Sequence, residues 1–95
     1  MSSSVSHNVY FDGKVQSLGI LTEKGKATVG VMKPGTYVFN TSSHEIMEIV
    51  SGVLRAKLSG GEWLSYKKGD AFEVAANSSF EVKCDADVAY ICYYN

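Results

Sequence analysis

The sequence predicts one all-β domain that closes on itself as a small barrel. Turn-forming residues recur at roughly 8- to 12-residue spacing, which leaves segments of strand length between them. These segments alternate apolar and polar residues and are rich in β-branched and aromatic types. About eight short strands in such a chain favour a barrel or sandwich, because closure hides the exposed edges of the sheets.

The expected elements follow from the turn signals in chain order. Those signals are Lys24-Gly25, Pro34-Gly35, Ser51-Gly52, Ser59-Gly60-Gly61, Lys67-Lys68-Gly69-Asp70, Ala76 to Ser79, and Asp85-Ala86-Asp87. Between them, the alternation is clearest over residues 27–31, 36–39 and 53–58. Residues 1–8 are Ser-rich and are expected to form a mobile tail, so that residues 9–95 make up the barrel domain.

The last two expected strands allow a prediction of register. A turn centred on Ala86 would place Cys84 opposite Val88 and Phe80 opposite Cys92, giving one apolar face. This register keeps the two cysteines apart, and their spacing matches neither a zinc site nor a redox motif. Both cysteines are therefore expected to be reduced and buried.

The opposite face of the last strand also carries apolar side chains. Ile91 and Tyr93 lie where a solvated strand would be polar. The pair could form a subunit interface, or it could be ordinary apolar surface of a small protein.

Composition restricts the classes of partner. The 95 residues are 45% hydrophobic and 20% charged, with a net charge of −1 and a pI near 6.1, which is typical of one globular domain. The basic residues are scattered, so no nucleic acid is expected as a partner. Neither a membrane-spanning apolar run nor a secretory leader pattern is present, and the prediction is a cytoplasmic protein without a membrane partner.

One stretch resembles the second signature motif of the cupin superfamily, whose members are double-stranded β-helix (jelly-roll) barrels. Gly69 is followed at the cupin spacing by Ala75, Asn77 and Phe80, which occupy the positions of a proline, a glycine and a metal-binding histidine. The resemblance thus implies the fold while the histidine is replaced.

The first cupin motif would end in Glu45, six residues and Gly52. Counting back from Glu45, or forward from Gly35 to place the glutamate at Glu48, puts no paired histidines at the ligand positions. A lone glutamate beside His44 offers too few strong ligands for a cupin metal. The sequence therefore predicts no metal site and no cofactor.

Nearly the whole chain resembles the small bacterial pyrimidine/purine nucleoside phosphorylases of cupin fold. The matching pieces are Tyr10 to Val15, Val29 to Met32, Gly35 to Tyr37, Met47, Ile49 to Gly52, and Tyr90 to Cys92. The resemblance implies an enzyme that splits purine and pyrimidine nucleosides with inorganic phosphate, yielding free base and ribose 1-phosphate. It also implies a homodimer.

Such a reaction needs a group for phosphate and a carboxylate near the sugar, because the sugar develops positive charge as the base leaves. Lys14 is the preferred candidate for phosphate, with Arg55 as the competitor. Glu45 and Glu48 are the candidate catalytic carboxylates, and strand alternation allows only one of them to point inward.

Aromatic side chains provide candidate surfaces for the base. They are Tyr37, Phe39, Phe72 and Phe80. Stacking on an aromatic ring tolerates both purines and pyrimidines, which agrees with broad specificity, although most aromatic residues of a β-barrel serve as core.

Two other functions are compatible with the residues. A metal-free cupin could bind a sugar, nucleobase or other small ligand without converting it. A sugar isomerase or epimerase would need a positioned general base, normally histidine, and the chain has only two histidines.

Overall fold

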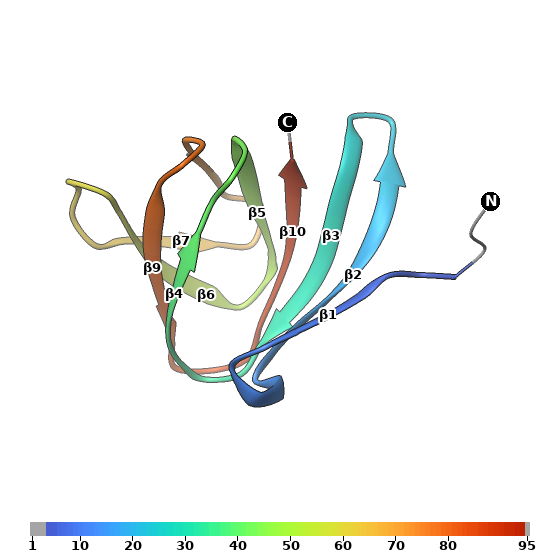
Figure 1. Cartoon of the computed structure of the whole chain (residues 1–95). Coiled ribbons are helices and arrows are strands. Elements are labelled where there is room, and N and C mark those ends of the chain that lie inside the picture. Colours follow the sequence, from blue (N-terminus) through green and yellow to red (C-terminus); the bar gives the residue numbers. More distant parts are fainter. Residues whose placement is uncertain (1–3, 95) are drawn as a thin grey trace.

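A computed structural model describes residues 4–94 and shows two antiparallel sheets that face each other (Figure 1). The strands are β1 (His7–Tyr10), β2 (Val15–Thr22), β3 (Gly25–Met32), β4 (Gly35–Asn40), β5 (Glu45–Ser51), β6 (Val53–Leu58), β7 (Leu64–Lys67), β8 (Ala71–Val74), β9 (Ser79–Cys84) and β10 (Val88–Tyr94). A three-residue 3₁₀ turn, η1 (Phe11–Gly13), follows β1. The expected all-β fold is confirmed.

The chain passes repeatedly from one sheet to the other. The larger sheet has the order β1-β2-β3-β10-β5-β8, and the smaller has the order β4-β9-β6-β7. The last strand therefore lies inside the larger sheet, between β3 and β5 (Figure 1). This exchange between sheets is typical of jelly-roll barrels.

Alternation along the strands creates the core between the sheets. On β6, Leu54 and Ala56 are buried while Val53 and Lys57 are exposed. Leu54 from the smaller sheet and Ile49 from the larger are 0% and 1% exposed. Burial of such side chains supplies the main stabilisation of the barrel, at about 1.5–3 kcal/mol for each large side chain.

The register predicted for the last two strands is wrong. β9 pairs with β4 and β6, whereas β10 pairs with β3 and β5. Residues 85–87 cross from one sheet to the other, so the two apolar faces oppose each other through the core instead of forming a hairpin. Cys84 and Cys92 are both buried and free, as expected.

The boundary expected between tail and barrel lies two residues too late. β1 begins at His7, which pairs with Leu18, and Asn8 pairs with Ser17. A side-chain hydrogen bond of 3.2 Å from Asn8 Nδ2 to Ser17 Oγ adds to this pairing. Residues 1–3 of the expected tail lie outside the described residues. Within residues 4–94, no helix has the length and apolar character needed to cross a membrane.

Candidate active site

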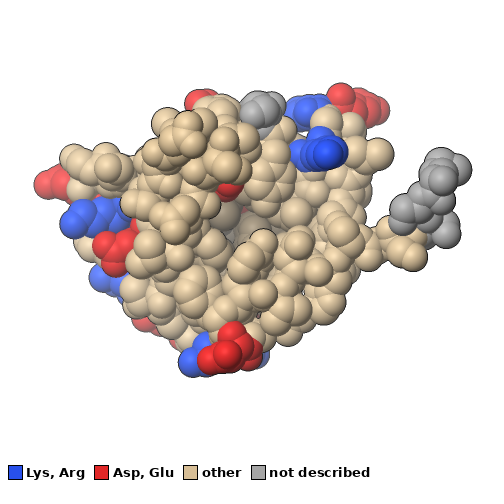
Figure 2. Space-filling model, in the orientation of Figure 1, with Lys and Arg blue, Asp and Glu red and all other residues tan. Residues whose placement is uncertain are grey.

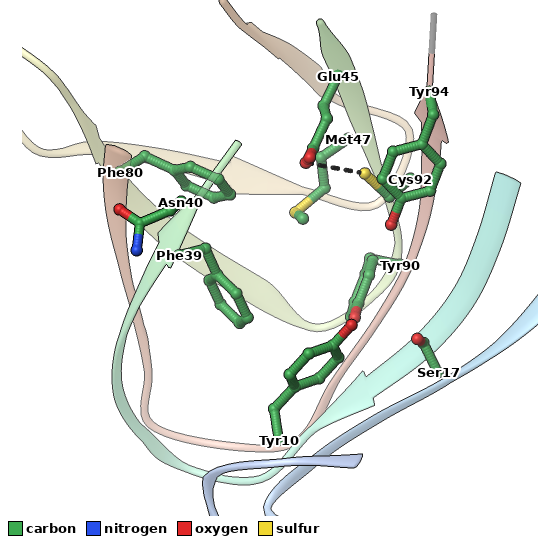
Figure 3. A pocket seen from close by; sticks show the side chains of 10 residues that line it. All are labelled: Tyr10, Ser17, Phe39, Asn40, Glu45, Met47, Phe80, Tyr90, Cys92 and Tyr94. Atoms are coloured by element: carbon green, nitrogen blue, oxygen red, sulfur yellow. Dashed lines mark hydrogen bonds between the residues drawn. The ribbon is translucent and has the colours of Figure 1, made fainter. Parts of the chain in front are cut away.

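A pocket of about 160 Å³ opens between the two sheets, inside the barrel. Figure 2 shows a hollow near the middle of this face, with most charged side chains towards the periphery. The pocket is lined by Tyr10, Ser17, Phe39, Asn40, Glu45, Met47, Phe80, Tyr90, Cys92 and Tyr94 (Figure 3). Glu45 is the only Asp, Glu, Lys or Arg among these lining residues.

Glu45 owes its inward direction to its position on β5. It pairs with Tyr94 of β10 and Val74 of β8, on the face that also carries the buried Met47 and Ile49. The side chains of neighbouring positions on a strand point to opposite faces. Glu48, opposite Ile91, consequently faces out of the barrel. Of the two glutamates, Glu45 lines the pocket and Glu48 does not.

The Glu45 carboxylate contacts a buried thiol. Cys92 Sγ donates a hydrogen bond to Glu45 Oε1 at 3.4 Å, drawn in Figure 3. Burial raises the pKa of Glu45, and the bond from Cys92 opposes part of that rise. Burial, together with the neighbouring Glu45, raises the pKa of Cys92 to about 12. The thiol is therefore protonated at neutral pH and can act as the donor.

Two tyrosines of β10 line the same wall. The Tyr90 ring lies across Gly30 of β3, and a methyl group at Gly30 would overlap that ring. Tyr94 shares a 3.0 Å hydrogen bond between its hydroxyl and Thr28 Oγ1. Burial raises the pKa of both tyrosines above that of free tyrosine, so both hydroxyls are neutral.

Aromatic rings form the opposite wall. Phe39 of β4 and Phe80 of β9 pair across the smaller sheet, with ring centroids 5.6 Å apart and planes at 28°. Phe11 of η1 packs its ring 5.4 Å from Phe39, and Tyr10 packs 6.3 Å from it. Phe11 adopts φ +51°, an uncommon value for a bulky residue, and these contacts hold it there.

Two of the expected aromatic residues support this wall from behind. Tyr37 is buried, donates its hydroxyl to the Lys33 carbonyl at 2.7 Å, and contacts the Phe11 ring at 4.9 Å. Phe72 is buried between Tyr66 and Phe80, at 4.7 and 6.1 Å between ring centroids. Neither residue lines the pocket: Phe72 fills the core beside Phe80, which does line it, and Tyr37 fills the core beside Phe11.

The expected cations lie away from the pocket. Lys14 borders a separate groove of about 450 Å³ on the outer face of the larger sheet, above Leu18 and Val29. Arg55 alternates with the buried Leu54 and Ala56, so it points outward, where Nη2 contacts both carboxylate oxygens of Asp85 at 3.2 Å. Lys14, Arg55 and Glu48 were expected in the site, but none of them reaches the pocket.

Sequence reasoning missed most of the polar lining. Cys92 had been expected in the core, and Tyr10, Ser17, Tyr90 and Tyr94 had been given no role in the site. Alternation on the last strand was the signal that could have found two of them, because Tyr90 and Tyr94 fall on the same face of the strand as Cys92. Alternation gives the face of a residue, but whether core or cavity lies above that face depends on the opposing sheet.

The donor set of the pocket suits a polyol with an apolar side. Hydroxyl, thiol and carboxylate groups from one sheet face aromatic rings from the other. Among residues 4–94, no three His, Cys, Asp or Glu side chains gather in a group that could hold a metal ion. A sugar presents hydroxyls on its edge and C–H groups on its faces, and this arrangement matches both.

Residues 5–94 match the family model described as pyrimidine/purine nucleoside phosphorylase. A protein of that name from Pseudomonas putida strain GB-1 is 50% identical over 88 residues, which cover 92% of this chain and 94% of the relative. Another of that name, from Vibrio cholerae, is 45% identical over 91 residues, covering 95% and 96%.

Solved structures agree with the architecture. A crystal structure of a protein of unknown function from Vibrio parahaemolyticus is similar, with a TM-score of 0.92 and 41% identity over 98% of this chain and 100% of that one. A putative ethanolamine utilization protein from Salmonella typhimurium gives a TM-score of 0.72 at 19% identity, covering 97% and 94%, and shares the fold. The expectation of a jelly-roll barrel of cupin type is confirmed.

Proposed function

Because this chain belongs to the pyrimidine/purine nucleoside phosphorylase family, we propose that it cleaves purine and pyrimidine nucleosides with phosphate, releasing free base and ribose 1-phosphate. We place the reaction in the pocket inside the barrel. The observation that carries this assignment is the half-buried Glu45 on one sheet, which faces the rings of Phe39 and Phe80 on the other.

The chemistry needs stabilisation of a developing cation. An oxygen of hydrogen phosphate bonds to the anomeric carbon of ribose while the bond to the base breaks. The base leaves with the electron pair and takes up a proton through water, and the phosphate releases one proton as it becomes the ester, so that the protons balance. The sugar passes through an oxocarbenium-like state. A carboxylate that is partly removed from water stabilises that positive charge more strongly than one in bulk solvent. Glu45 fills this role.

The volume of the pocket indicates which part of a nucleoside it can hold. Pockets for ligands of drug size usually measure about 300–1,000 Å³. The volume here is about 160 Å³, which suits a single ring. We therefore place the ribose inside, beside Glu45, and the base at the mouth against the edge of the aromatic wall. A base at the mouth makes few hydrogen bonds with the protein, so the site can accept both purine and pyrimidine nucleosides.

Phosphate enters a site without a lysine or arginine in its lining. The available donors are the side-chain amide of Asn40 and the hydroxyls of Tyr10, Ser17, Tyr90 and Tyr94, and neutral donors can bind phosphate oxygens through several hydrogen bonds. Lys14 borders the outer groove, on the other face of β2. We therefore expect Lys14→Ala to keep phosphorolysis near the wild-type rate.

Phosphate dependence is the direct test of the function. The purified chain is incubated with uridine, adenosine or guanosine, with and without phosphate, after treatment with a chelator. We expect free base and ribose 1-phosphate only when phosphate is present, and the same rate with and without chelator. If no base forms from any nucleoside at high protein concentration, the activity is absent, and the pocket should be screened as a binding site for a small ligand.

We also propose a homodimer that forms through the outer face of the larger sheet. Leu18, Ile20, Val29 and Val31 are 50%, 48%, 42% and 49% exposed on adjacent strands, and Ile91 of β10 lies beside Val29. An apolar patch of this continuity is typical of a surface that another protein covers. The same side chains on a second copy provide an apolar partner of equal extent.

A charge in this face is expected to prevent dimerisation. Val29 lies at its centre, paired with Leu18 and Ile91, so Val29→Glu would bury an unpaired carboxylate in the interface. In sedimentation equilibrium, the wild type is expected at twice its 10.3 kDa chain mass and Val29→Glu at the chain mass. Val38→Glu, on the exposed face of β4, serves as the control and should match the wild type. A monomeric wild type would refute the dimer.

We place the protein in the cytoplasm. Cys84 and Cys92 are unpaired, as cysteines usually are in reducing compartments.

A further inference from the structure

The pocket contains one contact between β5 and β10 that the reaction itself does not require. Cys92 Sγ lies 3.4 Å from Glu45 Oε1 and donates to it. Cys92 is 2% exposed and belongs to the core cluster, so its thiol has a fixed position. Glu45 is only half-buried and has several rotatable bonds. A fixed donor beside a flexible carboxylate restricts the directions in which that carboxylate can point.

We propose that Cys92 is a positioning residue, whose thiol holds the Glu45 carboxylate against the sugar during phosphorolysis. This inference rests on the proposed function and adds a residue to it. Cys92 acts through Glu45, and it neither attacks the substrate nor gives up its proton. A hydrogen bond to a charged acceptor is worth more than one between neutral groups, so its loss is expected to be visible in the rate.

The surroundings of Glu45 leave few other groups that could have this effect. The titratable groups that line the pocket with it are Cys92, Tyr90 and Tyr94 on β10 and Tyr10 on β1. On β8, the inward residues Phe72 and Val74 are apolar, while Glu73 faces outward and contacts His44 at 3.1 Å. The opposing rings of Phe39 and Phe80 carry no charge. Cys92 is therefore the lining group whose hydrogen bond directs the Glu45 carboxylate and lowers its pKa, against the larger rise that burial causes.

The sign of the pH effect follows from this contact. The thiol favours the ionised carboxylate and lowers the pKa of Glu45, against the rise that burial causes. Cys92→Ala removes the donor, so the pKa of Glu45 should rise further. Activity that needs ionised Glu45 then appears only at higher pH. Cys92→Ser keeps a donor on the same carbon and should restore the position of the acidic limb.

The chain contains a matched control. Cys84 is likewise buried, at 4% exposure, and donates its thiol at 3.4 Å to the Lys33 carbonyl, outside the pocket. Cys84→Ala deletes the same atom from the same core without altering a contact of Glu45. Any loss shared by both alanine variants reflects packing, and only a loss confined to Cys92→Ala reflects positioning.

The experiment compares the wild type, Cys92→Ala, Cys92→Ser and Cys84→Ala in two measurements. Steady-state phosphorolysis of uridine over a pH series gives kcat, KM and the acidic limb, and NMR titration of the Glu45 carboxyl carbon gives its pKa without any need for activity. For Cys92→Ala we expect about a 5- to 10-fold lower kcat, a smaller change in KM, and an acidic limb and Glu45 pKa both shifted to higher pH. Cys92→Ser and Cys84→Ala should stay near the wild type.

The outcomes separate the two claims. An inactive wild type refutes the proposed phosphorolysis and with it the role of Cys92 in that reaction, while the titration still decides whether the thiol controls Glu45. An active wild type whose Cys92→Ala variant keeps the wild-type pH profile and Glu45 pKa overturns the positioning role alone. Equal losses in Cys92→Ala and Cys84→Ala would likewise assign the effect to core packing.

Discussion

Replacing Glu45 by glutamine is expected to lower kcat for nucleoside phosphorolysis by about 100-fold or more. The amide has nearly the shape of the carboxylate and still accepts a hydrogen bond from Cys92, but it carries no charge to stabilise the sugar cation. KM should change less, because the cationic character develops only in the transition state. Steady-state rates at saturating phosphate measure both quantities.

Glu48→Gln is the control for this prediction. The two residues lie on the same strand and receive the same chemical change, but Glu48 pairs with Ile91 on the outer face. Its variant should retain the wild-type kcat within about 2-fold, as is usual for a side chain that contacts neither substrate nor core. A similar loss in both variants, or none in Glu45→Gln, would show that the pocket carboxylate is not the catalytic group.

Gly30→Ala is expected to destabilise the barrel and to reduce activity together. The new methyl group would overlap the ring of Tyr90, which is 5% exposed and cannot move away from β3 without entering the pocket. Overpacking of this kind costs about 1–3 kcal/mol of unfolding free energy. Urea denaturation measures the loss of stability, and the phosphorolysis assay measures the obstruction of the pocket.

The cause of that effect can be isolated by changing the ring. In a Tyr90→Leu background, Gly30→Ala should cost less than about 0.5 kcal/mol, because the overlapping atoms are gone. Gly61→Ala, at an exposed position with ordinary φ, should be equally mild in the wild type. If Gly30→Ala is as costly in the Tyr90→Leu background as in the wild type, the Tyr90 ring is not the reason for the glycine.

The face on which each residue of a strand lies could be predicted from the alternation of apolar and polar residues in the sequence. The alternation separated Glu45 from Glu48 on opposite faces of their strand. This inference needs only the two-residue period of a strand and the position of the apolar residues. Such an inference depends only on residues that are close in the sequence, so it can be made without knowing how the strands pair.

Neighbours across the sheets could not be predicted in the same way. The short turn at Ala86 can close a hairpin or carry the chain to the opposite sheet, and both leave Cys84 and Cys92 on apolar faces. Lys14 and Arg55 were chosen as phosphate ligands because their side chains are cationic. The direction in which each side chain points depends on the packing of the sheets, which the residue type does not reveal. For Arg55, alternation with Leu54 and Ala56 already indicated the outer face.

The strands that form the pocket differ in the number of neighbouring strands to which they hydrogen-bond. β5, which carries Glu45, lies between β10 and β8, whereas β1, which carries Tyr10, hydrogen-bonds to β2 alone. Strands with one neighbour open locally at a lower free energy than strands with two, and their amide protons exchange sooner. The strand that carries Tyr10 is therefore expected to open locally more often than the strand that carries Glu45. Substrate is then expected to enter past the β1 side of the pocket, while its conversion takes place beside Glu45 on β5.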